Sequence, residues 1–221
     1  MYAEKARKAK TPSKLKELVH STGAKYTALL ELPYYDAVRF VVIDPMHNLF
    51  LGIAKHTLKV WKESGVLNEK DFTLLQKRVN AFQPPPEIGR IPTKISTGFS
   101  GFTADQWKNW VCYYSLFSLK GILPNKHYNT WAQFVQACQI ICCHDIKFND
   151  CCLAEKKIIE FCKAFEKLYS KQYCTPNMHL CCHLIECVRD YGPVYSFWCF
   201  SFERYNGILG SYPKGSQNIG K

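Results

Sequence analysis

The clearest candidate for chemistry lies near the end of the chain, where one carboxylate stands in an aromatic segment. The aromatic neighbours of Glu203 are Phe197, Trp198, Phe200, Phe202 and Tyr205. Burying a lone carboxylate in apolar surroundings is costly unless a cation pairs with it. Arg204 is adjacent, but neighbouring residues of a helix point in different directions. A divalent metal is the sharper hypothesis, because hard cations prefer carboxylate oxygens. An acid on the exposed side of an aromatic helix is the alternative.

Two further pairs of residues have the types and spacing of metal ligands. Asp44 and His47 are separated by three positions at the start of an expected helix. His179 and His183 are separated by four positions on one helix face, so the two side chains of each pair can bind the same metal ion. Together they supply one carboxylate and three imidazoles, a set that suits Zn²⁺: Asp44, His47, His179 and His183. Cys181 or Cys182 could replace one of these ligands. Hydrogen-bonded core histidines are the alternative.

The chain contains 12 cysteines, and some of them are adjacent pairs: Cys142-Cys143, Cys151-Cys152 and Cys181-Cys182. No CxxC motif occurs, so the usual signature of a zinc ribbon is absent. Neighbouring cysteines on a helix point to different faces, and we therefore expect that they do not share a tetrahedral site. Most of these thiols are predicted to be small buried hydrophobic groups. A cysteine hydrolase is not indicated, because no spacing places a thiol beside a base.

Composition predicts a globular chain, and its charge is compatible with a polyanionic partner or with a solvated basic helix at the start of the chain. Of the 221 residues, 47% are hydrophobic and 14% aromatic, which excludes a disordered chain. No run of 18 apolar residues predicts a membrane span, and residues 1–10 lack the apolar segment of a signal peptide. We therefore expect a nuclear or cytoplasmic protein that is neither secreted nor membrane-bound. The net charge of +11 is compatible with DNA as a partner.

Apolar periodicity and capping residues predict a mostly α chain. Ser13 can cap the first helix and Gly23 can end it, while Asp44 and Pro45 have the types of an N-cap and a first helical residue. The helices are expected at about 11–22, 25–31, 45–64, 69–83, 103–119, 126–144, 149–170, 176–190 and around Glu203. The β-branched and aromatic segment 37–43 is the best strand candidate.

Several segments resemble CACTA (En/Spm)-type transposases, in the order of that family. Asp44-Pro-Met-His-Asn-Leu-Phe-Leu-Gly52 resembles its Asp-x-x-His motif. Arg90-Ile-Pro92 and Gly98-Phe-Ser-Gly-Phe-Thr-Ala-Asp-Gln-Trp-Lys-Asn-Trp110 resemble the helical region that follows. Tyr191-Gly-Pro-Val-Tyr-Ser-Phe-Trp198 and Phe202-Glu-Arg-Tyr-Asn-Gly207 resemble its C-terminal block. The blocks span nearly the whole chain.

The resemblance implies an RNase H-like DD(E/D) nuclease core, in which two aspartates and a later acid hold Mg²⁺ or Mn²⁺ for DNA cleavage and strand transfer. Glu203 matches the final acid, and a helical insertion precedes it. In similar recombinases a zinc site joins a two-residue motif to two histidines shortly before that acid. Here His183 precedes Glu203 by 20 residues (203 − 183). The resemblance therefore supports zinc at the four ligands named above, with an aspartate where the recombinases have a cysteine.

The two upstream aspartates of the family have no match, since Asp36 is the only aspartate before Asp44. We therefore expect the C-terminal portion of a transposase: a basic helical arm (1–36), a strand remnant with the Asp-x-x-His motif and the helical insertion (37–192), and the Glu203 helix with a tail (193–221). Alone it is expected to be catalytically incomplete and to retain DNA binding or homo-oligomerisation, with Trp107, Trp110 or Trp131 stacking on bases unless they are core residues. A nuclease completed by another chain, and a non-catalytic helical module with structural zinc, are the alternatives.

Overall fold

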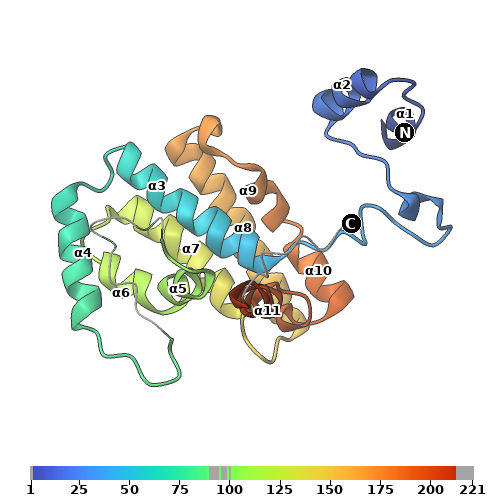
Figure 1. The fold of residues 1–221 in the computed structure, drawn as a ribbon. Helices are drawn as coiled ribbons and strands as arrows, with labels where there is room; N and C mark the ends of the chain where they lie inside the picture. Colours follow the sequence, from blue (N-terminus) through green and yellow to red (C-terminus); the bar gives the residue numbers. More distant parts are fainter. Residues whose placement is uncertain (1, 90–94, 96–98, 100, 213–221) are drawn as a thin grey trace. The chain divides into compact units, whose positions relative to one another are not determined.

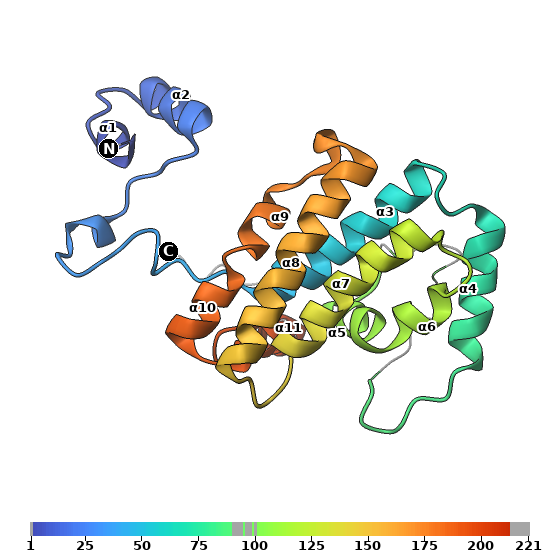
Figure 2. The same cartoon turned by 180° about the vertical axis from the view of Figure 1, so that it is seen from behind.

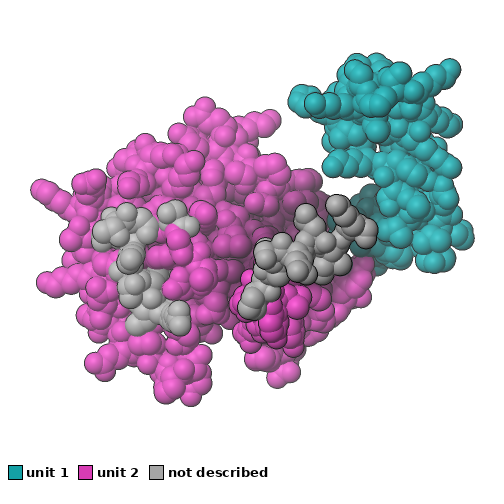
Figure 3. Space-filling view, viewed as in Figure 1, with its two compact units in different colours: residues 1–42 teal, residues 43–221 magenta. Residues whose placement is uncertain are grey.

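The computed structural model describes residues 2–89, 95, 99 and 101–212, and this part of the chain contains helices and no strand. The mostly α class is thereby confirmed. Two compact units are distinguished, residues 1–42 and 43–221, which Figure 3 colours separately. Parts of the family resemblance, Arg90–Pro92, Gly98 and Ser100, lie outside the described residues, as does the tail from Pro213.

The first unit contains α1 (Tyr2–Arg7), α2 (Pro12–Thr22) and the 3₁₀ turn η1 (Ala28–Glu31). Thr11, rather than Ser13, caps α2, because its hydroxyl accepts a hydrogen bond from the Lys14 backbone N–H at 3.2 Å. Gly23 ends the helix with φ of 69°, a left-handed conformation that a glycine adopts without a steric penalty.

The predicted strand at residues 37–43 is wrong. The Asp36 carboxylate accepts hydrogen bonds from the backbone N–H groups of Val38 and Arg39 at 2.8 and 3.0 Å, which closes a turn instead. Val38 and Val41 are 87% and 58% exposed, so the β-branched side chains have no sheet face to pack against. Residue preference for strands expresses packing in a sheet. No second strand in the described chain offers that packing.

The second unit contains most of the helices (Figure 1). They are η2 (Met46–Ala54), α3 (Lys55–Glu63), α4 (Glu69–Ala81), α5 (Ala104–Asn109), η3 (Trp110–Tyr114), α6 (Ser115–Leu119), α7 (Asn125–Ile141), α8 (Phe148–Tyr169), η4 (Lys171–Tyr173), α9 (Pro176–Cys181), α10 (Leu184–Tyr191), η5 (Val194–Ser196) and α11 (Phe200–Ser211). Of these, η2 and η3 are π-helical, while η4 and η5 are 3₁₀ turns. The expected helix at 176–190 is two helices, because the chain turns at Cys182 and His183.

The core of this unit is aromatic and lies between α3, α7 and α8, which run alongside one another in Figures 1 and 2. Trp61 of α3 packs edge-on against Trp131 of α7, with ring centroids 5.3 Å apart. Phe134 of α7 meets Phe161 of α8 at 4.9 Å. Such aromatic pairs contribute about 0.5–1.5 kcal/mol beyond the area that they bury.

A buried hydrogen-bond chain crosses this core and makes its stability depend on pH. The Trp61 indole donates to the Tyr169 hydroxyl at 2.6 Å, and the hydroxyl in turn donates to His127 Nδ1. Burial raises the pKa of Tyr169 to about 12, and burial with the neighbouring Lys126 lowers the pKa of His127. Tyr169 therefore stays a donor, and His127 accepts only while it is neutral.

We expect the free energy of unfolding to fall as the pH drops below about 6.5, the ordinary pKa of histidine, because the unfolded chain then binds a proton that folded His127 resists. Stability is full above that pH and is lost progressively down to the lowered pKa of the folded state. Urea unfolding at about pH 7.5 and about pH 5.5 measures this difference. His127→Asn keeps an acceptor near the Nδ1 position but does not titrate there, so the difference in the free energy of unfolding between the two pH values should shrink. An unchanged difference contradicts the assignment of the pH dependence to His127.

Ser170 ends α8 in a conformation that favours glycine. Its backbone angles are φ of 72° and ψ of 161°, and it is the only non-glycine residue in the described chain with a positive φ. A side chain in this region costs on the order of 1–3 kcal/mol. Ser170→Gly is therefore expected to raise the free energy of unfolding by about 1 kcal/mol, after allowing for the greater freedom of glycine in the unfolded chain. Urea unfolding measures the change, with Ser170→Ala as the control that should give no gain.

No helix in the described part of the chain combines the length and the apolarity needed to span a bilayer.

Candidate functional site

Asp44 organises the start of η2 through its carboxylate. Oδ1 accepts a hydrogen bond from the Met46 backbone N–H at 3.2 Å, and Oδ2 accepts one from the His47 backbone N–H at 3.0 Å. Oδ2 also bonds to His47 Nδ1, so the two side chains of the Asp-x-x-His motif are joined directly. Three-residue spacing at a helix start places them side by side, as the sequence predicts. The helix that follows is π-helical from Met46 to Ala54, a form that is frequent at functional sites.

The same carboxylate also holds the segment that begins α11. Asp44 Oδ1 accepts a hydrogen bond from the Cys199 backbone N–H at 2.9 Å, between residues 155 positions apart. Next to this bond Phe50 of η2 meets Phe200 of α11, with ring centroids 6.3 Å apart. The Lys108 ammonium of α5 lies 5.3 Å from the Phe200 ring centroid. The Asp-x-x-His motif and the Glu203 helix are therefore in direct contact.

The contact creates a group of three possible metal ligands. Ligand atoms of Asp44, His47 and Cys199 lie within 4.8 Å of one another. Burial, with the negative charge of Asp44 and a hydrogen bond to its carboxylate, raises the pKa of the Cys199 thiol, and the charge of Glu203 adds to the effect. The thiol is therefore held in its protonated form, which is the opposite of what a cysteine nucleophile needs. In the presence of a metal the same atoms offer one oxygen, one nitrogen and one sulfur.

The structure brings His179 and His183 together but does not join them to Asp44 and His47 in one group. The two imidazole rings lie 5.1 Å apart between centroids, and both side chains are exposed. His183 Nδ1 lies 3.2 Å from a carboxylate oxygen of Glu186. Among the described residues, no set of ligand atoms within 4.8 Å of one another contains both predicted pairs.

The elements that carry the two pairs are nevertheless packed together. The buried Asn48 side chain of η2 donates to the Asn177 backbone carbonyl of α9 at 2.9 Å. Asn48 lies one turn after Asp44, and Asn177 lies two residues before His179. Asp44 and His47 at the start of η2 and His179 of α9 are therefore carried by two helices in contact, while His183 lies in the turn after α9.

Glu203 lies in the first turn of α11, one turn after Cys199, and its backbone N–H donates to the Cys199 carbonyl at 2.9 Å. The helix buries no residue, and Phe202 and Tyr205 are each 65% exposed. The carboxylate is exposed too. The idea that it is buried among aromatic rings is therefore wrong, and Glu203 stands on the exposed side of an aromatic helix, beside the Asp44–His47–Cys199 group.

The tryptophans that were candidates for stacking on bases belong to the core. Trp107 is 0% exposed, and Trp110 and Trp131 are each 1% exposed. An aromatic side chain must be accessible to stack on an unpaired base. Base stacking by these three residues is therefore wrong, and the alternative, core packing, holds.

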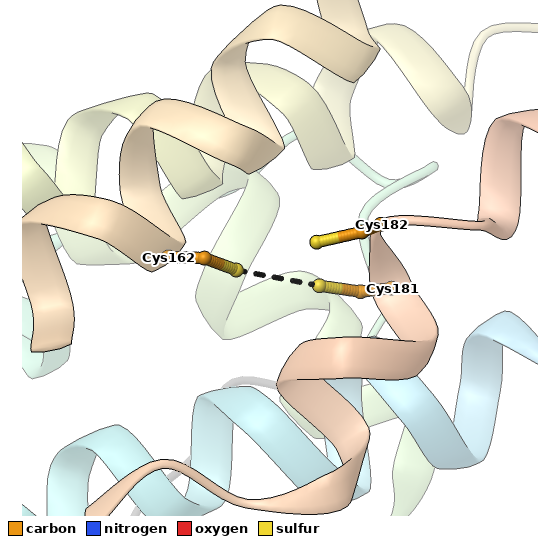
Figure 4. A group of neighbouring side chains, drawn as sticks. All are labelled: Cys162, Cys181 and Cys182. Atoms are coloured by element: carbon orange, nitrogen blue, oxygen red, sulfur yellow. Dashed lines mark hydrogen bonds between the residues drawn. The ribbon is translucent and has the colours of Figure 1, made fainter. Parts of the chain in front are cut away.

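A second group of ligands was missed by the sequence analysis, because it depends on tertiary packing and on a helix end. The thiols of Cys162, Cys181 and Cys182 lie within 4.8 Å of one another (Figure 4). Cys181 is the last residue of α9 and Cys182 follows it in the turn, and both thiols lie near Cys162 of α8, so the expectation that adjacent cysteines do not share a site is wrong for this pair. A hydrogen bond from the Cys181 thiol, with the nearby imidazoles of His183 and His179, lowers the pKa of Cys182 to about 6.

No protein-family model, curated protein or solved structure matches the chain. Its function must therefore be inferred from these two clusters, the charge and the fold.

Proposed function

We propose that the chain is a transposase-derived DNA-binding polypeptide, the C-terminal helical portion of an RNase H-like DD(E/D) enzyme, which is catalytically incomplete alone. The hydrogen bond from the Cys199 N–H to Asp44 carries the proposal. It connects the two ends of the family resemblance, the Asp-x-x-His motif and the helix of the final acid, across 155 positions. If the separate segments resembled the family only by chance, there would be no reason for them to meet in the fold.

The donor atoms support zinc here and do not support the two metal ions of the parent reaction. Asp44, His47 and Cys199 offer oxygen, nitrogen and sulfur, a mixture that Zn²⁺ accepts and Mg²⁺ does not favour. Two Mg²⁺ ions need several carboxylates, whereas Glu203 is the one residue here that matches a catalytic acid of the transposase family. We therefore derive no cleavage step for this chain, and His179 and His183 are the further zinc ligands that the resemblance suggests.

A basic face on α8 supports DNA as the partner. Lys156, Lys163 and Lys167 are exposed, and their spacing of seven and four residues places them on one face of the helix, which also carries Glu160, the ion-pair partner of Lys156 at 3.9 Å. Lys156 and Lys163 are separated by about 10 Å along the axis, at 1.5 Å per residue. With a net charge of +11 and buried tryptophans, binding is expected to rest on phosphate contacts without base recognition.

Fluorescence anisotropy with a labelled DNA duplex tests this proposal. Affinity should fall at least about tenfold between roughly 50 and 200 mM salt, because phosphate contacts release counterions. Lys163→Glu/Lys167→Glu should weaken binding more than the control Lys59→Glu/Lys62→Glu on α3, which changes the net charge equally at exposed positions. Absence of binding at low salt, or equal effects of the two variants, contradicts the proposal.

The adjacency of His179 and His183 favours a second candidate, a non-catalytic helical module with structural zinc. Metal analysis of the purified chain and of His179→Ala/His183→Ala addresses it. Zinc that is present in the wild type and lost from the variant supports this candidate, and a metal-free, fully folded wild type contradicts it.

A Mn²⁺-dependent nicking assay, with Glu203→Ala as the control, tests the active-nuclease alternative.

A further inference from the structure

We propose that Cys162, Cys181 and Cys182 form a binding site for a thiophilic d¹⁰ cation, Zn²⁺ or Cu⁺, separate from the Asp44–His47–Cys199 group. Cys162 projects from α8, Cys181 is the last residue of α9, and Cys182 follows it. Figure 4 shows the three sulfur atoms converging from these two helices. Thiolate is the ligand that soft cations select over carboxylate or water.

The sulfur spacing already approaches that of a bound state. Cys162 Sγ and Cys181 Sγ are 3.7 Å apart. Two thiolates that each bind one Zn²⁺ at about 2.3 Å with tetrahedral angles lie about 3.8 Å apart. The third sulfur is within 4.8 Å of both, so a rotation of one side chain, without movement of the helices, would complete the set.

The polar environment of the thiols also favours a metal. All three sulfur atoms lie around one acceptor, the Met178 backbone carbonyl, which is 3.6 Å from Cys162, 3.1 Å from Cys181 and 3.4 Å from Cys182. A carbonyl oxygen has two lone pairs, and S–H is a weak donor, so three thiols cannot all bond well to it. A metal would replace these three weak contacts with metal–sulfur bonds and release the thiol protons.

Burial gives the site both an enclosed side and a route of entry. Cys181 is fully buried, whereas Cys162 and Cys182 are half-buried. An ion can therefore reach the sulfurs from the side of Cys162 and Cys182. The described ligand group contains three sulfurs and no side-chain nitrogen or oxygen. Three sulfurs can satisfy Cu⁺ alone, whereas Zn²⁺ would need a fourth ligand, such as water.

The test is titration of the whole reduced chain with Cd²⁺, a spectroscopic substitute, read by sulfur-to-metal charge-transfer absorption. One equivalent of Cd²⁺ should give the absorption band. Cys162→Ser/Cys182→Ser should weaken the affinity for Cd²⁺ more than roughly 100-fold, because it removes two direct ligands, and the loss of groups that only support ligands already costs about 10–100-fold. Cys143→Ser/Cys152→Ser, which removes two exposed thiols, is the matched control and should keep the band. His179→Ala/His183→Ala and His47→Ala/Cys199→Ser should keep it too, which separates this site from the zinc site of the proposed function.

Competition between Zn²⁺ and Cu⁺ for the Cd²⁺-loaded chain then identifies the preferred ion. Alkylation provides a readout that does not depend on how the serine variants fold: one equivalent of metal should protect Cys162 and Cys182 of the wild type from iodoacetamide, while Cys143 stays reactive. A wild type without the charge-transfer band overturns the proposal. So does a band that survives when Cys199→Ser is added to Cys162→Ser/Cys182→Ser, or unprotected Cys162 and Cys182 in the metal-loaded chain.

Discussion

Asp44→Ala is expected to lower the free energy of unfolding by about 3 kcal/mol, because it removes a helix cap worth about 0.5–2 kcal/mol and further hydrogen bonds to a charged group. The carboxylate accepts bonds from the N–H groups of Met46, His47 and Cys199, and its side chain is only 15% exposed. Alanine leaves these donors without their partner. Urea unfolding measures the loss.

The same substitution should release the start of α11, because the bond to Cys199 N–H joins that segment to η2. Hydrogen exchange should accelerate at the amides of Cys199 and of the first turn of α11. The matched control is Asn68→Ala, which removes the N-cap of α4, whose side chain bonds only the N–H groups of Lys70 and Asp71. It should cost about 1 kcal/mol and leave exchange in α11 unchanged. Equal effects of the two substitutions would contradict the bridging role of Asp44.

Local signals predicted most helix boundaries. Asp44 and Pro45 start η2, and Asn68 with Asp71 forms a reciprocal cap at the start of α4. Gly23 ends α2. Each of these features involves residues within about one turn, so its physics is contained in the neighbouring sequence. The strand prediction at 37–43 lacked such a basis, since a strand is stable only against a partner that the local sequence does not specify.

The candidate sites were predictable only where their ligands lie three or four residues apart in the sequence. The pairs Asp44–His47 and His179–His183 follow from spacing, and both are close in the structure. The addition of Cys199 to the first pair depends on a contact across 155 positions. The cysteine cluster needed two facts that periodicity does not contain, the packing of α8 against the turn after α9 and the end of α9 at Cys181.

The packing of η2 against α9, which brings the Asp-x-x-His turn and the helix of His179 together, depends on a glycine. A Cβ built on Gly52 would lie 2.4 Å from Asn177 Nδ2, 2.9 Å from Asn177 Cγ and 2.8 Å from the His47 backbone oxygen. The Asn177 side chain can rotate away, but the His47 carbonyl belongs to the π-helical turn itself. The close approach therefore requires glycine at this position of the Asp-x-x-His segment.

Gly52→Ala is accordingly expected to lower the free energy of unfolding by about 2 kcal/mol, within the range of about 1–3 kcal/mol typical of overpacking. Gly207→Ala in α11 is the matched control: a Cβ there meets nothing within 4 Å, and alanine in a helix is favoured over glycine by up to about 1 kcal/mol, so the control should be neutral or stabilising. Adding Asn177→Ala removes two of the three close contacts and should recover part of the loss, while the His47 carbonyl contact keeps the rest. A Gly52→Ala chain as stable as the wild type would mean that η2 and α9 are not held in this close packing, and His179 of α9 would then lose its fixed place beside the Asp-x-x-His turn.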